Sequence, residues 1–321
     1  MKRKILIILL AVLVLIFSLL PFSRTLFSAL TKNQYQNRSR LNFLILGLDP
    51  RNDQLEQTNT TDTIILASFN LDTATVSLVS LPRDLWYYPL SVKINQIYPL
   101  SLEQTSDQFD FIQGHFSTII GQKIDHTLIL TTQDLIDFVD VLGGVNVNLD
   151  TGFTDNQFPN PDYIKNPSPS IPVYITISFP AGPNHLDQSN IGYFVRSRKN
   201  AEIATAGGTD LGRTYRQQLL LEAIIQKIKD NSPNLLLLKD VYRFYHQQIQ
   251  TNFSEQNIID LLLATRAQLL NFNLKKITIP AGEDAQTDLI YYPGRLFRGQ
   301  WVFLPQEEDY RSLQRFIQDS L

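Results

Sequence analysis

The sequence lacks cysteine altogether and contains only four histidines. Without cysteine there can be no disulfide, no thiolate zinc site and no cysteine nucleophile. This absence does not assign a compartment, because many exported proteins also lack cysteine. The histidines stand far apart and are each expected to be structural or surface residues, not metal ligands: His115, His126, His185 and His246.

Several catalytic signatures are missing as well. There is no Gly-x-Ser-x-Gly elbow, no phosphate-binding Gly-Lys-Ser/Thr loop, no Gly-x-Gly-x-x-Gly turn and no His-Glu-x-x-His pair. An excess of positive charge is also absent, since 28 Lys and Arg stand against 31 Asp and Glu. No global basic field is available to hold a nucleic-acid backbone, so nucleic acid is not expected as a partner.

A long hydrophobic run is present at the N-terminus. Basic residues in 1–4 precede an apolar stretch over 5–22, long enough to cross roughly 30 Å of hydrocarbon. A cleaved signal peptide is the alternative, but the run is longer than a usual h-region and no convincing small-x-small site follows it. We therefore expect a retained anchor in the cell membrane, with the N-terminus cytoplasmic and the C-terminal domain extracytoplasmic.

These features predict four parts of the chain: a cytoplasmic basic tail at 1–4, a transmembrane anchor at 5–22, a juxtamembrane tether at 23–40 and one extracytoplasmic domain at 41–321. Ordered structure is expected to begin at Leu41. With 43% hydrophobic residues, the chain has enough apolar material for one large domain or two small ones.

Alternating apolar runs and helical spacings predict an α/β domain with a mixed sheet. Strands are expected at 41–49, 62–69, 75–81, 126–130, 145–149, 173–177, 275–279 and 301–304. Helices are expected at 107–120, 132–142, 214–229, 235–248, 254–270 and from about 306, with Gly143-Gly144 and Ser254 as caps. The Pro, Asn and Asp-rich stretch 151–172 is expected to be a loop.

Polar side chains stand where the first three predicted strands begin or end. Asp49 and Arg51 follow the first strand, Asp62 opens the second, and Arg83-Asp84 follows the third. Because an antiparallel hairpin places the start of its first strand beside the end of its second, Asp62 and Arg83 are expected to be neighbours. Local turn or cap roles are the alternative for each residue taken singly.

A second concentration of charge lies in FVRSRKNAEIATAGGTDLGRTYRQQ, which carries Arg196, Arg198, Lys199, Arg213 and Arg216. Guanidinium groups present paired donors that suit phosphate oxygens. Carboxylates without histidine or cysteine partners suit a hard cation such as Mg²⁺. Together these residues predict a pyrophosphate and metal site. The alternative is a solvated basic face, or a docking surface for anionic lipid headgroups.

The order of several short motifs carries a family resemblance. NFLILGLDPR, TDTIILASFN, VSLVSLPRD, KIN, IDHTLILTTQDLIDFVDVLGGVNVNL, FVRSRK and TDLGRTYRQQ follow one another from about residue 41 onward. In this order they resemble the LytR-CpsA-Psr family of membrane-anchored bacterial envelope proteins. Pro50 and Thr61 stand where many members have Ser, and the segment LDQSNIG departs from the family pattern.

The resemblance implies a three-layer α/β/α sandwich with a central mixed β-sheet, preceded by one transmembrane helix. It also implies a Mg²⁺- or Mn²⁺-dependent phosphotransferase. Such an enzyme moves a glycopolymer, for example teichoic acid or capsule, from a polyprenyl-pyrophosphate carrier to peptidoglycan and releases polyprenyl phosphate.

Carried over position by position, Asp49 and Asp62 match the carboxylates associated with the metal. The residues matched to catalysis are Arg83, Asp62, Arg196, Arg198, Arg213 and Asp210, of which Asp210 is a candidate general base. The residues matched to the pyrophosphate and sugar-phosphate are Arg51, Lys93, Arg196, Arg198, Arg213 and Gln217.

Two functions of other classes remain alternatives. One is a non-catalytic envelope protein that binds polyprenyl-linked glycolipids. The other is a membrane-bound transcriptional attenuator, against which the N-terminal span and the lack of a basic recognition helix count.

Overall fold

The computed structural model describes most of the chain, namely residues 33–48, 60–104, 107–197, 209–230, 235–265 and 272–321. The predicted membrane span at 5–22 lies outside these residues. Within the described part, no helix combines the length and the apolar composition needed to cross a bilayer.

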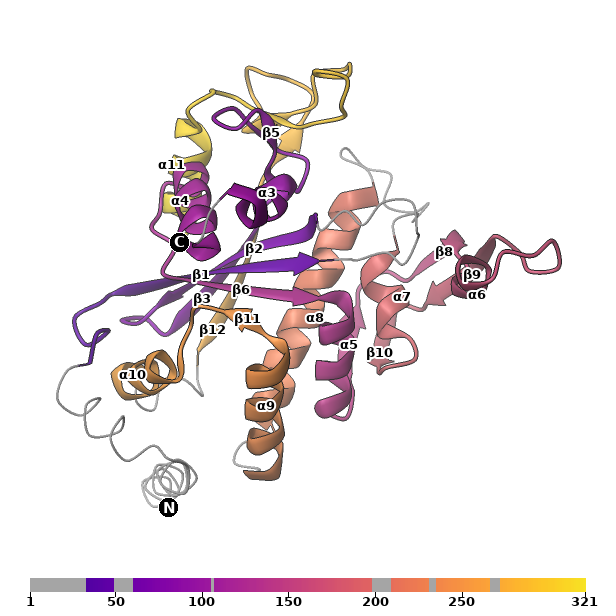
Figure 1. Cartoon of the computed structure of the whole chain (residues 1–321), viewed down its shortest axis with the longest axis horizontal. Helices are drawn as coiled ribbons and strands as arrows, with labels where there is room; N and C mark the ends of the chain where they lie inside the picture. The colour runs from indigo at the N-terminus through magenta and orange to yellow at the C-terminus, as the bar shows by residue number, and fades with distance from the viewer. Residues whose placement is uncertain (1–32, 49–59, 105–106, 198–208, 231–234, 266–271) are drawn as a thin grey trace.

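A six-stranded mixed sheet forms the centre of the molecule (Figure 1). Its strands, in spatial order, are β11 (Gln250–Thr251), β6 (His126–Thr131), β1 (Arg40–Leu48), β2 (Thr61–Asn70), β3 (Thr75–Ser80) and β12 (Asn273–Thr278). β1 pairs antiparallel with β2 and parallel with β6, and β12 pairs parallel with β3. The expected mixed sheet is confirmed, and the continuous apolar run of β1 is explained by its place inside the sheet.

The predicted hairpin is formed by β2 and β3, which pair antiparallel from Asn70 opposite Thr75 to Ile65 opposite Ser80. The Asn70 side chain accepts hydrogen bonds from the backbone N–H groups of Asp72 and Thr73, both at 3.0 Å. A short turn stabilised in this way leaves no room for a crossover, so the two strands must be antiparallel.

Helices cover both faces of this sheet (Figure 1). On one face lie α3 (Ile97–Gln104), α4 (Gln108–Ile120) and α11 (Arg311–Ser320). Phe116 of α4 and Ile317 of α11 are fully buried in the same core cluster as Leu44 and Leu66 of the sheet. Alternate strand residues point to opposite faces, so Leu41 and Phe69 instead pack with α10 (Glu255–Thr265) on the other side.

A second core lies beside the sheet and is formed by the middle of the chain. Its elements are α5 (Thr132–Val141), β7 (Val145–Leu149), β8 (Phe153–Pro159), β9 (Tyr174–Phe179), β10 (Gly182–Leu186), α7 (Ile191–Arg196) and α8 (Thr209–Asp230). β7 pairs with β10, and β8 pairs with β9, so neither joins the central sheet. The β8–β9 hairpin with α6 (Pro161–Lys165) projects from the body in Figure 1.

Local signals explain where α5 begins and ends. Thr131 and Asp134 form a capping box, in which the Thr131 side chain accepts from the Asp134 N–H and the Asp134 side chain accepts from the Thr131 N–H. At the other end Gly143 and Gly144 have φ angles of 69° and 79°, which glycine adopts without steric cost. The predicted cap is confirmed.

Most predicted strands and helices agree with the structure to within one or two residues. The Ser254 cap is also confirmed, because the Asn257 N–H donates to Ser254 Oγ at 3.2 Å. The helices α9 (Leu235–Gln248) and α10 begin where they were predicted.

Four predictions were wrong in position or type. Residues 151–172 are not a loop but contain β8 and α6, and a register shift between Asp155 and Phe158 hides the two-residue alternation of β8. The helix α8 begins at Thr209 instead of 214, because packing of its arginines outweighs the low helix propensity of Gly212. The final helix begins at Arg311, since Tyr310 adopts a positive φ of 65° that no α-helix contains. The strand predicted at 301–304 is reduced to β15 (Leu304–Pro305).

The described structure also begins before Leu41, where the tether was expected to continue. Tyr35 is 4% exposed, and its hydroxyl lies 2.6 Å from Nε2 of the buried His126. Arg38 pairs with Asp125 at 2.8 Å. Residues 33–39 therefore pack against the end of the sheet where β1 and β6 begin. There Tyr35 shares a small apolar cluster with Leu41.

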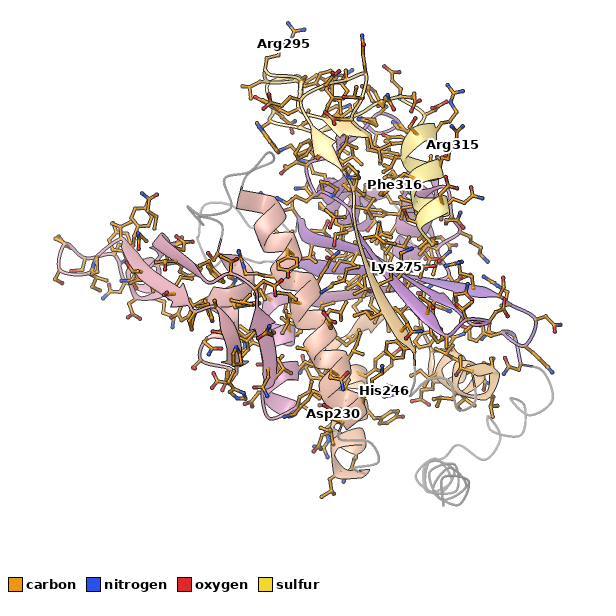
Figure 2. All side chains as sticks on the ribbon, turned by 180° about the vertical axis from the view of Figure 1, so that it is seen from behind. Asp230, His246, Lys275, Arg295, Arg315 and Phe316 are labelled. Carbon is orange, nitrogen blue, oxygen red and sulfur yellow. The ribbon has the colours of Figure 1, made fainter. Side chains whose placement is uncertain are left out.

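Short strands build an additional layer above the sheet. They are β4 (Trp86–Tyr87), β5 (Val92–Lys93), β13 (Ala281–Gly282), β14 (Ile290–Tyr291) and β15, with a 3-10 turn η1 at Ile94–Gln96. Figure 2 shows Arg295, from the loop after β14, at the end of the molecule opposite Asp230 and His246. None of these two-residue strands has a periodic sequence signal, so sequence reasoning missed all of them except β15, which overlaps the strand predicted at 301–304.

Candidate active site at the ends of β1, β2 and β3

Asp62 lies at a β-bulge near the start of β2. Thr63 pairs with Gly47 and Thr61 pairs with Leu48, so Asp62 is the extra residue between the two pairs. A bulge of this kind bends the strand and re-aims a side chain. Gly47 permits the close approach, because a Cβ at position 47 would lie 2.8 Å from the Cβ of Thr63.

Arg83 lies three residues after the end of β3, in a turn closed by a hydrogen bond from the Leu85 N–H to the Pro82 carbonyl at 3.0 Å. Its Nη1 donates to Oδ1 of Asp62. The hairpin β2–β3 creates this pair, since the start of β2 and the end of β3 meet at the same end of the sheet. The expected proximity of Asp62 and Arg83 is confirmed.

Asp84 joins Lys93 to Arg83. The Nζ atom of Lys93 lies 2.7 Å from Oδ1 of Asp84, and Nε of Arg83 lies 3.4 Å from Oδ2. Lys93 reaches this position because β5 pairs with β4, with Lys93 opposite Trp86. Sequence reasoning did not assign Asp84 to the site. Its only signal was its place beside Arg83 in the Pro-Arg-Asp motif, because the β4–β5 pairing could not be predicted.

Arg213 approaches Asp62 from α8. Its Nη1 lies 3.5 Å from Oδ2 of Asp62, and its Nη2 donates to the Asp62 backbone carbonyl at 3.2 Å. The Arg213 side chain is 3% exposed, so this guanidinium has little access to bulk water. The earlier start of α8 places Arg213 inside the helix, and Asp210 is also in the helix, although its side chain is not among those described.

These five side chains carry three positive and two negative charges. Arg83, Lys93 and Arg213 supply the cations, and Asp62 and Asp84 supply the carboxylates. The four side chains around Arg213 are each 13% to 20% exposed. Partial burial lowers the effective dielectric, so the surplus positive charge acts more strongly on an anionic ligand than it would on an open surface.

The arginines of the middle segment have different surroundings. Arg216 is 3% exposed, and its guanidinium donates to the backbone carbonyls of Phe194 at 3.0 Å and of Ser197. It also lies 4.4 Å from the centre of the Phe153 ring. Burial, followed by the nearby charge of Arg213, lowers the pKa of Arg216 to about 10. Arg216 is therefore a clamp on the C-terminal end of α7, where the exposed Arg196 stands.

Two glutamines of α8 have separate positions. Gln218 is buried and donates to Ser80 Oγ at 2.8 Å, which fixes α8 against the last residue of β3. Gln217 is partly buried and stands four residues after Arg213, on the same side of the helix. Gln218 thus helps to hold Arg213 in register with Arg83.

Three residues of the predicted site fall outside the described structure: Asp49, Arg51 and Arg198. Among the described residues, no group of three or more His, Cys, Asp or Glu side chains could hold a metal ion. Mg²⁺ does not require such a group, because one or two carboxylates with waters and phosphate oxygens commonly suffice. Among the described residues, the Asp62 carboxylate is an oxygen donor of this kind.

The four histidines have local partners, in agreement with the structural or surface roles expected for them. The hydrogen-bonded or ion-paired contacts are His115 with Tyr87 at 2.9 Å, His126 with Tyr35 at 2.6 Å, His185 with Asn146 at 2.8 Å and His246 with Glu255 at 2.7 Å.

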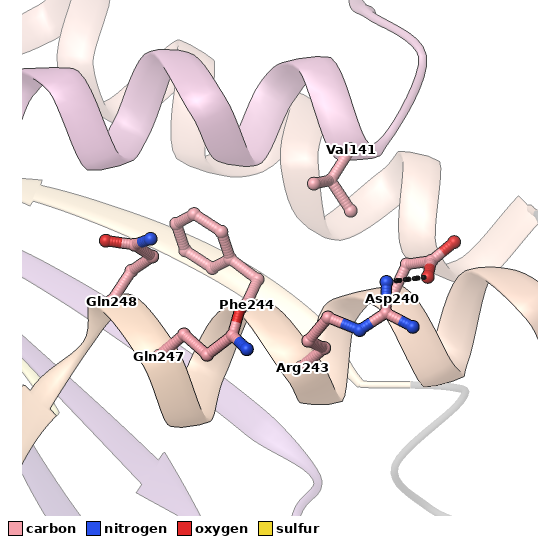
Figure 3. Close-up of a pocket in the computed structure, with 6 residues that line it drawn as sticks. All are labelled: Val141, Asp240, Arg243, Phe244, Gln247 and Gln248. Carbon is pink, nitrogen blue, oxygen red and sulfur yellow. Dashed lines mark ion pairs between the residues drawn. The ribbon is translucent and has the colours of Figure 1, made fainter.

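A shallow hollow of about 180 Å³ lies elsewhere, between α5 and α9 (Figure 3). Val141 lines it from α5, and the remaining lining residues come from α9. Its charged groups, Asp240 and Arg243, are paired with each other at 3.3 Å. None of its lining residues belongs to the charged cluster, so we place the candidate active site at the cluster and not at the hollow.

The fold agrees with that of related chains. The model of the LytR_cpsA_psr family matches residues 23–315, and the chain belongs to this family. A relative from Bacillus mycoides (strain KBAB4), named polyisoprenyl-teichoic acid–peptidoglycan teichoic acid transferase TagU, is 25% identical over 256 residues, which cover 78% of this chain and 72% of the relative.

Solved structures of similar fold include TagV of B. subtilis, with a TM-score of 0.62 and 17% identity over 89% of this chain and 98% of that one. Another is described as TagT bound to LI-WTA, with a TM-score of 0.60 and 20% identity over 90% of this chain and 94% of that one. At these identities the structural likeness concerns the fold.

Proposed function

We propose that this protein transfers a phosphate-linked glycopolymer from a polyprenyl-pyrophosphate carrier to peptidoglycan and releases polyprenyl phosphate. The observation that carries the proposal is the convergence of Arg83, Lys93 and Arg213 on Asp62 and Asp84 at one end of the sheet. A pyrophosphate bears several negative charges, and this cluster offers a surplus of cations held by neighbouring carboxylates.

The named relatives support the same reaction. Several are teichoic acid transferases that use a polyisoprenyl-linked donor and a peptidoglycan acceptor according to their names. We propose a glycopolymer of the teichoic acid class for this chain, with a capsule-type polymer as the variant within the same chemistry.

The reaction balances as a single displacement at phosphorus. A sugar hydroxyl of the acceptor attacks the phosphorus that carries the glycopolymer, and a new P–O bond forms. The bond to the bridging oxygen breaks, so polyprenyl phosphate leaves with the bonding electron pair. The hydroxyl proton passes to a carboxylate base, for which Asp210 is the candidate.

The cations of the site act on the charge that develops in this step. Arg83 and Lys93 are positioned to bind pyrophosphate oxygens, because Asp84 holds both side chains at the same edge. Arg213, fixed by Asp62, adds a nearly buried guanidinium that needs no reorganisation. We assign Arg51, Arg196, Arg198 and Gln217 to the surrounding contacts with the pyrophosphate and the sugar-phosphate.

A divalent cation, Mg²⁺ or Mn²⁺, completes the proposal, with Asp49 and Asp62 as its protein ligands. Such an ion would supply Lewis-acid neutralisation of phosphate charge. Asp62 would then have two tasks, since its carboxylate also orients Arg83 and Arg213.

The location of the protein follows from its N-terminal sequence. We propose that 5–22 anchors the chain in the cell membrane, that 1–4 is cytoplasmic and that 41–321 is one extracytoplasmic domain. A donor already activated as a lipid pyrophosphate suits that compartment, where ATP is not expected.

The test uses the full-length chain in detergent micelles with a polyprenyl-pyrophosphate oligosaccharide, a peptidoglycan fragment and Mg²⁺. Mass spectrometry follows polyprenyl phosphate and the new sugar-phosphate-glycan product. We expect Arg83→Ala to lower product formation by about a hundredfold or more. Arg38→Ala is the matched control, because Arg38 also pairs with an aspartate but lies at the opposite end of β1.

A chelator should abolish the reaction, and added Mg²⁺ should restore it. Binding of the lipid donor without release of polyprenyl phosphate, with every acceptor offered, would overturn the transferase proposal and leave a glycolipid-binding protein. Equal activity of the wild-type chain and Arg83→Ala would show that the cluster is not the site.

A further inference from the structure

An aromatic and basic loop stands on the surface between β14 and β15. Trp301 is 40% exposed, and its ring stacks on Tyr292 with a centroid distance of 5.3 Å and an interplanar angle of 24°. Arg295, Leu296 and Arg298 of the same loop are exposed. The reaction proposed above uses none of these side chains, although a large exposed aromatic surface is uncommon unless it contacts a partner.

The tip of this loop is a tight two-residue turn. Phe297 and Gln300 exchange two backbone hydrogen bonds of 2.9 Å each. The intervening Arg298 and Gly299 have φ angles of 49° and 78°, as in a type I′ turn. Arginine in the left-handed region costs on the order of 1 kcal/mol, so the surroundings must hold Arg298 in place.

The rings beneath the turn hold Arg298. Its guanidinium carbon lies 5.6 Å from the centre of the Trp86 ring and 5.7 Å from that of the Phe297 ring. Trp86 and Phe297 themselves meet edge to face at 5.2 Å. Arg298 is thus an exposed cation whose side chain is already held in place by the two rings. A ligand that contacts Arg298 would therefore cost less side-chain entropy.

The loop is attached to the charged cluster through the backbone. The Phe303 N–H donates to the Asp84 carbonyl at 2.9 Å, and the Trp86 N–H donates to the Phe303 carbonyl at 2.8 Å. The Trp301 ring contacts Phe303 at 4.8 Å, edge to face. The exposed aromatic pair is therefore connected, through Phe303, to the residues that directly follow Arg83.

We propose that Tyr292, Trp301, Arg295 and Arg298, here called the aromatic platform, bind the glycan strand of the acceptor. This inference rests on the proposed function for the identity of the acceptor. A pyranose ring has an apolar C–H face that packs on a flat aromatic surface, while its hydroxyls stay in water. Peptidoglycan strands also carry carboxylates, which match the two arginines.

The chemistry of the platform favours a glycan over a lipid surface. Segments that lie in a membrane surface are typically amphipathic helices with a continuous face of Trp, Phe and Leu, whereas this loop is a tight turn with two stacked rings and two guanidinium groups. Figure 2 shows Arg295 pointing away from the body of the protein, so this side chain is open to a ligand outside the fold.

The two tryptophans of the chain make a direct test possible. Trp86 is 1% exposed and Trp301 is 40% exposed, so quenching of fluorescence by acrylamide reports mainly on Trp301. The full-length chain in micelles is titrated with uncross-linked peptidoglycan strands. We expect the strands to protect Trp301 from acrylamide, and vesicles of phosphatidylglycerol to give no such protection.

Variants then locate the contact by equilibrium binding of labelled strands. Trp301→Ala should weaken binding about tenfold, and Trp301→Tyr, which retains a flat ring, should recover most of it. Arg298→Ala should weaken binding less and reduce its salt dependence. Tyr174→Ala is the matched control, because Tyr174 is an aromatic residue 53% exposed on the separate hairpin β8–β9.

Each outcome decides the matter. No strand binding by the wild-type chain, or protection of Trp301 by vesicles alone, overturns the platform. Wild-type transfer combined with unchanged strand binding by Trp301→Ala overturns the platform and leaves the transferase proposal intact. Strand binding lost in Trp301→Ala but recovered in Trp301→Tyr supports the platform even if the wild-type chain transfers nothing, a result that would overturn only the proposed reaction.

Discussion

The two ends of the central sheet each hold a carboxylate in contact with two cations, yet the surroundings differ. At one end Asp62 contacts Arg83 and Arg213. At the other end Asp125 pairs with Arg38 at 2.8 Å and lies 3.8 Å from Lys123. The same residue types therefore do not by themselves distinguish a site from a structural link.

The difference lies in what else each carboxylate contacts. Asp125 accepts from the Asn42 backbone N–H at 2.9 Å, and the Asn42 side chain donates to the Lys123 carbonyl at 2.8 Å. Ser68 Oγ closes this network by donating to Asn42 Oδ1 at 2.6 Å. Hydrogen bonds to the backbone occupy the polar groups here, so this end fixes the sheet.

At the Asp62 end, charged side chains meet charged side chains. Arg83 lies between two carboxylates, and Lys93 adds a third cation through Asp84. Both ends carry one surplus positive charge, so the distinction is that three cations lie together at the Asp62 end. Such an arrangement is typical of sites that bind anions.

The largest expected effect comes from matched substitutions of the two aspartates. Asp62→Asn should lower transfer by about a thousandfold, because Arg83 and Arg213 lose their shared partner and the proposed metal would lose a ligand. Asp125→Asn should leave kcat unchanged and lower the free energy of unfolding by about 1 to 2 kcal/mol. Steady-state kinetics and urea denaturation of both variants measure the two quantities. The comparison fails if Asp125→Asn is the more damaging to kcat.

The next effect concerns the clamp on α7. Arg216→Ala should lower the free energy of unfolding by about 3 kcal/mol, because two buried carbonyls lose a charged donor and the Phe153 ring loses its cation. Arg216→Lys keeps a charge without the planar fork and should recover less than half of the loss. Thermal unfolding of both variants measures the effect. An unchanged unfolding temperature in Arg216→Ala would contradict the role of Arg216 as a clamp on α7.

The pH dependence of stability tests the opposite end of the sheet. Burial is the largest cause and lowers the pKa of His126 to about 4. The charge of Asp125 and a hydrogen bond with the Asn252 backbone raise this pKa, and the charges of Arg38 and Lys123 lower it. Because the unfolded histidine binds its proton near its ordinary pKa of about 6.5, stability is complete above that pH. It should fall as the pH drops from about 6.5 to about 4, by up to about 3 kcal/mol.

Unfolding followed between pH 4 and 8 measures this dependence. His126→Phe serves as the control, since a non-titrating ring of similar size should flatten the curve in that window. An equally steep curve in His126→Phe would assign the dependence to other groups.

The smallest expected effect is that of Tyr35→Phe. The substitution removes the hydroxyl that lies 2.6 Å from Nε2 of His126 and retains the buried ring. We expect a loss of about 1 kcal/mol in the free energy of unfolding, with an unchanged denaturant slope. No change at all would mean that the Tyr35–His126 hydrogen bond does not contribute to the stability of the sheet end.

The sequence contained enough information for one half of the charged cluster. The turn between β2 and β3 is short, and the antiparallel pairing it requires places Asp62 beside Arg83. The strands and most helices were predictable for the same reason, since local apolar period and caps determine them.

The other half of the cluster depends on contacts between distant segments. Lys93 reaches Asp84 through two-residue strands that have no periodic signal. Arg213 and Arg216 stand three residues apart in one motif, and only the packing of α8 assigns one to Asp62 and the other to α7. Trp301 belongs to no recognised motif, and its exposure could not be read from its hydrophobicity.

The contact between Arg213 and Asp62 has a consequence for the order of assembly. The two residues are 151 positions apart, whereas Arg83 is only 21 positions from Asp62. Closing the longer loop is the slower event, so the hairpin and its Asp62–Arg83 pair can form while α8 is still undocked. A chain at that stage has a folded hairpin but an unfinished anion site. Docking of α8, with Gln218 on Ser80, is thus the step at which a folding intermediate would acquire the complete set of charges.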